Sequence, residues 1–306
     1  MNRKKIAVPV IAGDYVNVFC PEPRVYPGPD GKELKKGRFY ETWVPNDHCF
    51  VRGKDGGWHL FGITHPLTSV ENVHEGEVQL FHAKTTTDIF KEITPRMFSD
   101  LGCILPPDER PDEPKEIHSP YLVEIGGVYH MIYGPKHFRL AKSHDLASWE
   151  LKGDLFYDGE GDSRDPQVMI HDDTYCLCYC SGHEVRMRTS PDFYHWSDPA
   201  TILVMPETVC PESPFLLNCG GIFYLFVCFW DWRDLDRREE TLETAYQHKT
   251  QVFAAERIEE LPGSEPVTVL EAHAPEIVQS GNGFFISSAE WPSRGINLAR
   301  LHFSTP

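Results

Sequence analysis

Short hydrophobic runs joined by Gly- or Asp-rich turns recur along this chain, and each pair of runs has the pattern of a β-hairpin. The runs are rich in Val, Ile, Phe and Tyr, and turns such as Gly126-Gly127 and Asp172-Asp173 accept positive φ. Nearly every position within a run is apolar, which predicts strands that are buried on both faces. Four of these hairpins begin with a small or acidic residue followed by proline: Ser119-Pro120, Asp165-Pro166, Ser213-Pro214 and Ala274-Pro275.

The hairpins belong to an internal repeat. The four prolines are 46, 48 and 61 residues apart, and a fifth copy without the proline begins at Asn46-Asp47. In two units a third strand and a turn of the form Ser-x-Asp-φ-x-x-Trp follow the hairpin, at Ser143 to Trp149 and at Ser190 to Trp196. Its Ser and Asp side chains can bond to backbone amides of the turn.

Five units of about four strands, with a period near 40 to 50 residues, are typical of a five-bladed β-propeller. We therefore predict an all-β fold, a single-domain five-bladed β-propeller over residues 1–306. The blades are expected to begin near residues 46, 119, 165, 213 and 274. An N-terminal strand, either Lys5 to Ile11 or Val16 to Phe19, is expected to complete the last blade and close the ring.

Propeller geometry places candidate chemistry at one mouth of the central channel, because the first strand of each unit is the innermost one. The residues expected there are Asp47, His118 with Ser119, Asp165, Glu212 and His273. Three carboxylates in one cavity are costly through repulsion and desolvation, and such a cluster is typical of a metal site or of acid/base catalysis. Pro166 is expected to hold Asp165 in an extended conformation and so to fix the direction of its side chain.

The loops after the second strands are expected to surround the same mouth. They carry His65, Lys136 with His137, His183, Trp230, and Trp291 with Arg294. Aromatic rings and neutral donors around an acidic floor suit a sugar, whose C–H faces stack on indole while its hydroxyls bond to carboxylates. We therefore predict an oligosaccharide or glycoside as the binding partner.

Composition narrows the classes of partner. The formal charge of −17 disfavours nucleic acids and anionic membranes, because such a surface repels phosphate groups. No apolar run is long enough for a membrane span, and the N-terminus has no secretory cleavage pattern.

Nine cysteines in a chain of this length predict reduced thiols and a cytoplasmic location. Cys176, Cys178 and Cys180 alternate along one strand and are expected in the core rather than at a zinc site.

Several motifs carry a family resemblance. Asn46-Asp47, Trp58-His-Leu-Phe61 and Phe81-His-Ala83 look like the first blade of invertases, and Arg164-Asp165-Pro166 matches an invertase and levansucrase motif. Glu212-Ser213-Pro214 resembles the Glu-small-Pro motif of arabinanases. The chain thus resembles the five-bladed propeller glycoside hydrolases, a grouping of the invertase/levanase family 32, the levansucrase family 68 and the arabinanase/β-xylosidase family 43.

The resemblance implies a glycosidase that cleaves a glycosidic bond, with a furanoside (fructosyl or arabinosyl) oligosaccharide as substrate. It makes Glu212 the general acid, and Asp47 the nucleophile of a retaining enzyme or the water-activating base of an inverting one. It assigns Asp165 to stabilising the developing positive charge, with Arg164 orienting it or bonding sugar. The residues expected to bind substrate are Asn46, Arg164, His118, His183, Trp230 and Trp291.

Two questions stay open from the sequence. His273 resembles a histidine that supports a structural Ca²⁺ or water site in the channel of arabinanase-type enzymes, although packing against backbone carbonyls is an alternative; no cofactor is expected to be required. The alternatives for function are a hydrolase or phosphorylase acting on another sugar, and a non-catalytic carbohydrate-binding propeller.

Overall fold

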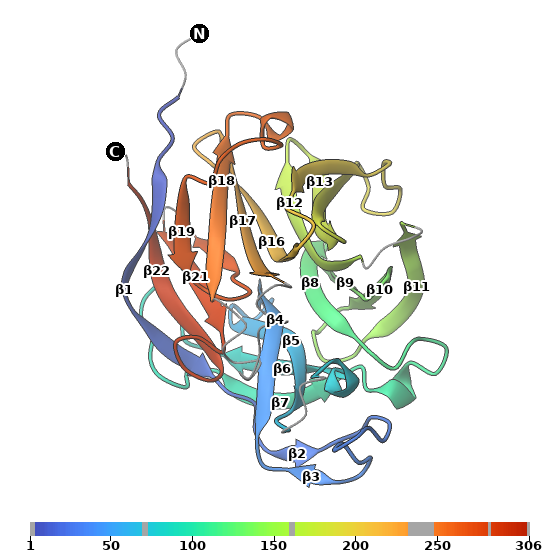
Figure 1. Ribbon diagram of the computed structural model, residues 1–306. Helices are drawn as coiled ribbons and strands as arrows, with labels where there is room; N and C mark the ends of the chain where they lie inside the picture. The colour runs from blue at the N-terminus through green and yellow to red at the C-terminus, as the bar shows by residue number, and fades with distance from the viewer. Residues whose placement is uncertain (1–3, 69–72, 159–162, 232–247, 281–282, 305–306) are drawn as a thin grey trace.

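Five four-stranded antiparallel sheets surround a central axis (Figure 1). The computed structural model describes residues 4–68, 73–158, 163–231, 248–280 and 283–304. Within these ranges the regular elements are strands and three short 3₁₀ helices, and no helix is long and apolar enough to cross a membrane. The prediction of an all-β five-bladed propeller is confirmed. The 3₁₀ helices are η1 (Val73–Gly76), η2 (Pro107–Glu109) and η3 (Ile258–Glu260).

Each blade is built from strands that are neighbours in sequence, because tight turns connect consecutive antiparallel strands. In blades one to four, the order along the chain runs from the innermost strand outward. Blade one contains β4 (Trp43–Arg52), β5 (Trp58–Pro66), β6 (Gln79–Thr85) and β7 (Ser99–Ile104); blade two contains β8 (His118–Ile125), β9 (Val128–Gly134), β10 (His137–Ser143) and β11 (Glu150–Tyr157). Blade three contains β12 (Arg164–His171), β13 (Thr174–Ser181), β14 (Glu184–Ser190) and β15 (Ala200–Val204); blade four contains β16 (Val209–Cys219), β17 (Ile222–Asp231), β18 (Lys249–Ala255) and β19 (Thr268–Glu271).

The fifth blade joins the two ends of the chain. It contains β20 (Ile277–Ser280), β21 (Gly283–Ala289) and β22 (Ile296–Ser304), and β1 (Val8–Phe19) pairs antiparallel with β22 as its outermost strand. The start of β1 and the end of β22 therefore lie side by side, where Val8 pairs with Ser304 (Figure 1). One continuous strand takes the place of the two alternative N-terminal segments considered from the sequence, with a bulge between Ala12 and Val16.

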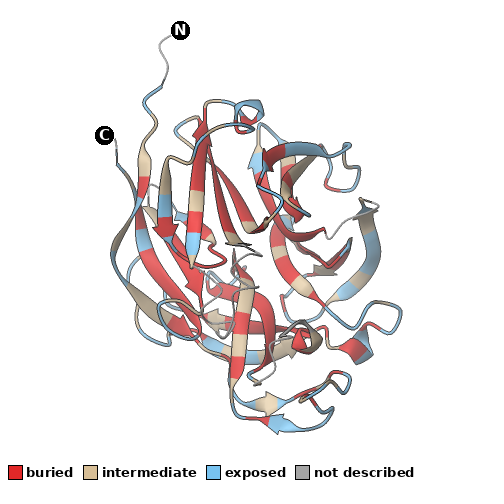
Figure 2. Ribbon diagram, viewed as in Figure 1, coloured by how far each residue is buried: buried red, intermediate tan, exposed pale blue. Residues whose placement is uncertain are grey.

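The core is divided among the interfaces between blades. Each of the five interfaces holds one cluster of buried hydrophobic side chains, because both faces of each sheet are covered by a neighbouring blade. β5 is buried along its whole length, whereas β11 on the rim is mostly exposed (Figure 2). Cys176, Cys178 and Cys180 lie in the cluster between blades three and four, as expected from their alternation.

The Ser-x-Asp turns fasten neighbouring blades together. In blade two the Ser143 hydroxyl oxygen accepts a hydrogen bond from the backbone amide of Leu146, and the Asp145 carboxylate accepts one from the backbone amide of Ala147. Trp149 of this turn packs edge-on against Phe61 of blade one, with ring centroids 5.9 Å apart. The turn of blade three makes the same bonds, so the repeated motif is a structural one.

A bulge interrupts the innermost strand at the same point in each of blades one to four. In blade three it lies between Arg164 and Gln167, where the strand pairing shifts register. The residues that precede the four prolines all have positive φ, between 33° and 57°: Ser119, Asp165, Ser213 and Ala274. The expectation of an extended Asp165 is therefore wrong. Pro166 excludes the right-handed helical region for Asp165, and the extra residue of the bulge turns the chain into the left-handed region instead.

Outside the ring, β2 (Arg24–Val25) and β3 (Phe39–Tyr40) form a small two-stranded sheet ahead of blade one (Figure 1). It has its own small cluster of buried side chains, which includes Tyr26 and Trp43. The sequence repeat did not predict this unit, since it occurs once.

Candidate active site

The bulges bring Asp47 and Asp165 together across the channel axis. The innermost strands β4, β8, β12 and β16 contact one another in turn around this axis. The Ser119 hydroxyl lies 3.0 Å from Asp47 Oδ2 and 2.6 Å from Asp165 Oδ1. The Ser213 hydroxyl donates to Asp47 Oδ1 over 2.7 Å, and its backbone amide donates to Asp165 Oδ2 over 3.0 Å. Two serines from blades two and four therefore hold two carboxylates from blades one and three in a closed network.

Asp47 has an unusual protonation equilibrium for an aspartate. Burial, together with the negative charges of Asp165 and Glu77, raises the pKa of Asp47 to about 7, against the opposing effect of its hydrogen bonds from Ser213 and Ser119. Its carboxyl group can therefore exchange a proton near neutral pH.

Arg164 supplies positive charge beside Asp165. Its Nε lies 3.6 Å from Asp165 Oδ2, and its Nη2 donates to the Pro211 carbonyl over 2.8 Å. Burial is the largest single effect and opposes the Arg164 cation, but the charges of Asp165, Cys180, Cys210 and Glu212 together outweigh it and keep the pKa of Arg164 well above its usual value. Arg164 therefore stays charged, and it links Asp165 to the strand that carries Glu212.

Glu212 lies one residue before the left-handed Ser213, on the same bulge of β16. It pairs in register with Cys228 on β17. The charge of Glu212 contributes to the raised pKa of Arg164. Burial is the main cause of the raised pKa of Cys228, and the charges of Glu212 and Asp47 add to it. The three carboxylates predicted from the sequence thus gather at one end of the channel.

Two further acidic residues stand beside this cluster, and sequence reasoning missed both. Glu276 lines a small cavity of about 20 Å³ together with Asp47, Ser119, Asp165 and Ser213. Burial, with a contribution from Asp47, raises the pKa of Glu276 well above its usual value. The repeat carried a signal for it, because Glu276 is two residues after Ala274 where the other units have Tyr121, Gln167 and Phe215.

Glu77 has no such signal, because it precedes β6 in a segment without a repeat pattern. It is 2% exposed, and its charge contributes to the raised pKa of Asp47. His118 lies beside it, with Nε2 3.5 Å from Glu77 Oε2. His118 therefore stands in the acidic surroundings of Asp47, as predicted from its place at the start of blade two.

The other residues predicted to bind substrate are distributed around the same end. Trp291 stacks on His248 with ring centroids 4.9 Å apart, and His248 lies next to His273. Trp230 and Asn46 are half-buried near the ends of β17 and β4 that lie beside the bulges. His183 bonds through Nδ1 to the Val209 carbonyl over 3.2 Å, which makes it an anchor for the segment that leads into β16.

His273 is buried, and its ring is fixed by the backbone. Its Nδ1 lies 3.1 Å from the Ala289 carbonyl, and its own amide donates to Ser288. Burial, reinforced by His248, lowers the pKa of His273 to about 4, so its ring is neutral at pH 7. Nδ1 carries the proton in this arrangement, because a carbonyl oxygen can only accept.

Of the described residues, Glu212, Cys228 and His273 form a group of possible metal ligands, with ligand atoms within 4.8 Å of one another. Ca²⁺ takes six to eight oxygen ligands, which include backbone carbonyls and water. Only Glu212 of these three residues offers oxygen, so a Ca²⁺ ion here would draw most of its ligands from water or the backbone.

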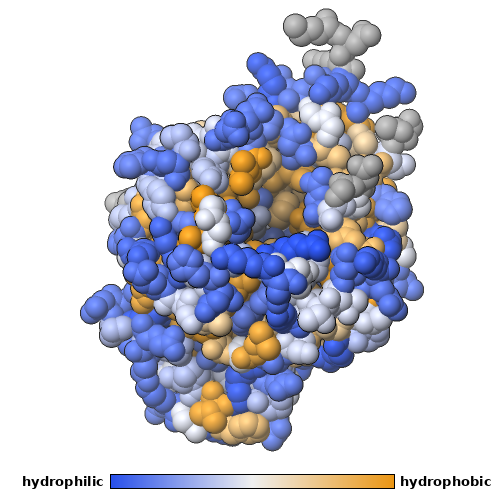
Figure 3. Space-filling view, turned by 180° about the vertical axis from the view of Figure 1, so that it is seen from behind, coloured by the Kyte–Doolittle hydropathy of each residue, from blue (hydrophilic) through white to orange (hydrophobic). Residues whose placement is uncertain are grey.

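The surface seen from behind is mainly hydrophilic and is hollowed near its centre (Figure 3). This matches a chain whose excess acidic residues lie largely outside the core. The site itself uses few of the 46 Asp and Glu residues.

Known structures share this architecture. An exo-1,5-α-L-arabinanase from a bovine ruminal metagenomic library superposes with a TM-score of 0.61 at 15% identity, covering 84% of this chain and 92% of that one. A thermostable family-43 glycoside hydrolase gives 0.60 at 13% identity, with coverage of 87% and 92%. The chain has the five-bladed propeller fold of the family-43 glycoside hydrolases.

A further structure matches over almost its whole length. It is reported for a family of mannoside phosphorylases that contains glycoside hydrolases targeting β-1,2-mannosidic linkages in Candida mannan. It has a TM-score of 0.61 at 13% identity and covers 97% of this chain and 96% of that one. No protein-family model and no curated protein sequence matches this chain. At such low identities the likeness establishes the fold.

Proposed function

We propose that this protein is a glycoside hydrolase that cleaves a furanoside oligosaccharide, fructosyl or arabinosyl, with Asp47, Asp165 and Glu212 as its catalytic carboxylates. The observation that carries the proposal is the network in which Ser119 and Ser213 bind Asp47 and Asp165 beside Glu212. Glycosidic cleavage needs an acid for the leaving oxygen and a carboxylate that acts at the anomeric carbon. The arabinanase among the structural neighbours favours a furanoside.

Asp47 is suited to act as a general base. A pKa of about 7 lets the carboxylate accept a proton from water near neutral pH. The water oxygen then bonds to the anomeric carbon as the bond from that carbon to the leaving oxygen breaks. A nucleophilic carboxylate would be favoured by a low pKa instead, so this environment supports the inverting reaction of the two considered.

Glu212 completes the reaction as the general acid. It gives its proton to the leaving oxygen, while Asp47 takes one from water, so that the two carboxyl groups exchange protonation states in each cycle. Asp165, fixed by Ser119, by the Ser213 amide and by Arg164, offers negative charge to the oxocarbenium-like transition state.

The test is a screen of aryl glycosides, fructo-oligosaccharides and arabino-oligosaccharides for released sugar, run in parallel with the wild-type chain and Asp47→Asn. Release by the wild-type protein that the variant lacks supports the proposal. If folded wild-type protein releases sugar from none of these substrates, the furanosidase assignment fails. Equal release by both proteins contradicts the role of Asp47.

A phosphorylase is the second candidate, because one structural neighbour, which covers 97% of this chain, is reported for a family of mannoside phosphorylases that contains glycoside hydrolases. Phosphate would need cationic groups at the site, and Arg164 is already engaged by Asp165 and Pro211. Running the same screen, with β-mannosides added, in phosphate and in a phosphate-free buffer distinguishes the two. A sugar phosphate formed only in phosphate would replace hydrolysis as the function.

We also propose a cytoplasmic location. All nine cysteines are free thiols in this structure, which suits a reducing compartment. Fractionation of the source cells with an antibody against this chain would test it, and recovery only from the secreted fraction would contradict it.

A further inference from the structure

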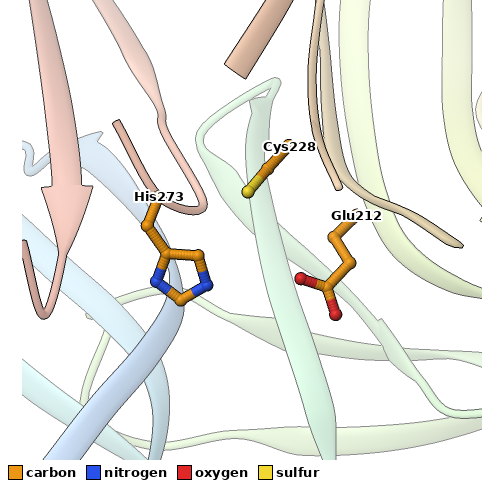
Figure 4. A group of neighbouring side chains, drawn as sticks. All are labelled: Glu212, Cys228 and His273. Carbon is orange, nitrogen blue, oxygen red and sulfur yellow. The ribbon is translucent and has the colours of Figure 1, made fainter. Parts of the chain in front are cut away.

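Three side chains with metal-binding atoms meet beside the candidate active site. A carboxylate oxygen of Glu212, Cys228 Sγ and a ring nitrogen of His273 all lie within 4.8 Å of one another. Figure 4 shows the three side chains converging, from β16, from β17 and from the segment that precedes β20. Cys228 and His273 are buried, and Glu212 is half-buried.

The orientation of His273 is the one that metal-binding histidines adopt. Such residues generally donate the proton of one ring nitrogen to a carbonyl or carboxylate and bind the metal with the other nitrogen. His273 Nδ1 faces the Ala289 carbonyl at 3.1 Å, so Nε2 carries the lone pair. The ring is therefore set for coordination before any ion arrives.

The donor set identifies the class of metal. Sulfur, imidazole nitrogen and carboxylate oxygen are ligands of Zn²⁺ in proteins, with three protein ligands and one open position in many sites. Thiolate and imidazole together disfavour Ca²⁺ and Mg²⁺. We propose that Glu212, Cys228 and His273 form a binding site for Zn²⁺ or a similar borderline-soft divalent cation.

The distances and charges agree with this site. Bonds of about 2.0 to 2.3 Å to a tetrahedral ion place its ligand atoms roughly 3.3 to 3.8 Å apart. The three donors of this cluster lie within 4.8 Å of one another, which is close to that spacing. A thiolate and a carboxylate neutralise the two positive charges of the ion. Binding releases the thiol proton to solvent, together with the proton of Glu212 when that carboxyl is protonated, and this leaves the occupied site neutral.

The site has a consequence for catalysis, and this part rests on the proposed function. A Glu212 carboxylate that coordinates a cation cannot hold the proton that the leaving oxygen needs. The metal-bound protein would therefore be an inactive form, and removal of the metal by a chelator would restore hydrolysis. In this arrangement the cation acts as a reversible inhibitor of the enzyme.

The test measures metal binding directly, without any substrate. Co²⁺ is titrated into the chelator-treated full chain, and near-ultraviolet absorption reports the charge-transfer band of a thiolate–cobalt bond. We expect this band with one equivalent of Co²⁺, its loss on addition of Zn²⁺, and its absence in Cys228→Ser. Zn²⁺ affinity, measured by calorimetry, should fall about 100-fold or more in Cys228→Ser.

Cys219→Ser is the matched control. Cys219 is at the far end of the same hairpin, where it pairs with Ile222, and it is more accessible than Cys228. Its loss should leave the cobalt spectrum unchanged. A charge-transfer band that disappears in Cys219→Ser and persists in Cys228→Ser would overturn the assignment.

The wild-type spectrum decides the matter even if Cys228→Ser does not fold. Co²⁺ bound without a thiolate band, or no binding of Co²⁺ or Zn²⁺ at micromolar concentrations, would contradict the proposal. Because the readout needs no sugar, a protein that binds Zn²⁺ through Cys228 and yet hydrolyses no glycoside would refute the proposed function while leaving this site in place.

Discussion

The Ser213 hydroxyl donates to Asp47 Oδ1 over 2.7 Å, although the two residues are 166 positions apart in the chain. Ser213 follows Glu212 directly, so this bond links Asp47 of blade one to the strand of blade four that carries Glu212. The same serine also donates its amide to Asp165. One residue is thereby bonded to Asp47 and Asp165 and adjacent in the chain to Glu212.

Replacing Asp47 by Asn should abolish hydrolysis while preserving the fold. The amide cannot accept a proton from water, and we expect kcat/KM to fall by about 10²- to 10⁴-fold. The measurement is steady-state kinetics, with circular dichroism to verify folding. Asp55→Asn is a matched control, because Asp55 is an exposed carboxylate at the β4–β5 turn. Unchanged turnover in Asp47→Asn would remove this residue from the mechanism.

Glu212→Gln should affect substrates according to their leaving groups. Loss of the acid should lower turnover of oligosaccharides by about 10²- to 10⁴-fold, whereas an aryl glycoside with an acidic phenol leaves without protonation and should be affected less. Comparing kcat for the two substrate types in wild-type protein and variant measures the difference. An equal loss for both types would argue against an acid role for Glu212.

The pH profile should report the ionisation of Asp47. The base is active when it is ionised, so kcat/KM should rise with pH through a value of about 7 in the free enzyme. Asp165→Asn removes a negative charge that raises this pKa, so the residual activity should have its acidic limb at lower pH. A limb that stays in place would show that Asp165 does not act on Asp47.

Ser213→Ala should move the acidic limb in the opposite direction. The hydroxyl bond favours the ionised form of Asp47, so its loss should raise the pKa of this carboxyl further. We expect kcat to fall by about 10- to 100-fold, from the loss of one bond to a charged group, with a smaller change in KM. Ser190→Ala, at a buried serine in the turn of blade three, is the control and should leave the pH profile unchanged. A fall in kcat without a shift of the limb would indicate a purely structural role for Ser213.

Stability should depend on pH through the same carboxyl group. The folded-state pKa of Asp47, about 7, lies above its ordinary value of 3.8, so the folded protein holds a proton that the unfolded chain loses. The wild-type chain therefore loses stability as pH rises from about 4 through 7, relative to Asp47→Asn, which does not ionise. We expect the variant to gain about 1 to 3 kcal/mol over the wild type across this range. Urea unfolding of both proteins at pH 5 and pH 8 measures it, and an equal difference at the two pH values would contradict the assignment.

The internal repeat allowed the fold to be predicted from the sequence. Alternating runs and turns define hairpins locally, and five copies can bury their apolar faces only against one another, so the ring follows from the pattern. For the same reason the positions of Asp47, Asp165 and Glu212 could be inferred, because equivalent positions in a propeller converge on its axis. Glu276 also lies at a repeated position, the one that Tyr121, Gln167 and Phe215 occupy in the other units. An alignment of the units with one another would have identified it.

Other features needed the tertiary structure, because they depend on contacts between segments without a shared pattern. Glu77 and His118 meet through a connection that has no counterpart in the other blades. The left-handed conformation of Asp165 arises from a bulge, which pairing with β13 creates and which proline alone does not dictate.

The sequence by itself determined the architecture and the convergence of Asp47, Asp165 and Glu212 on the axis, since both follow from a periodic pattern. Only the tertiary structure decided how these residues are protonated and bonded. The pKa of Asp47 depends on burial and on charges from other blades, and the approach of Cys228 to His273 depends on how blades four and five pack. Electrostatic energies and ligand geometry vary steeply with distances of a few ångströms, which no local pattern encodes.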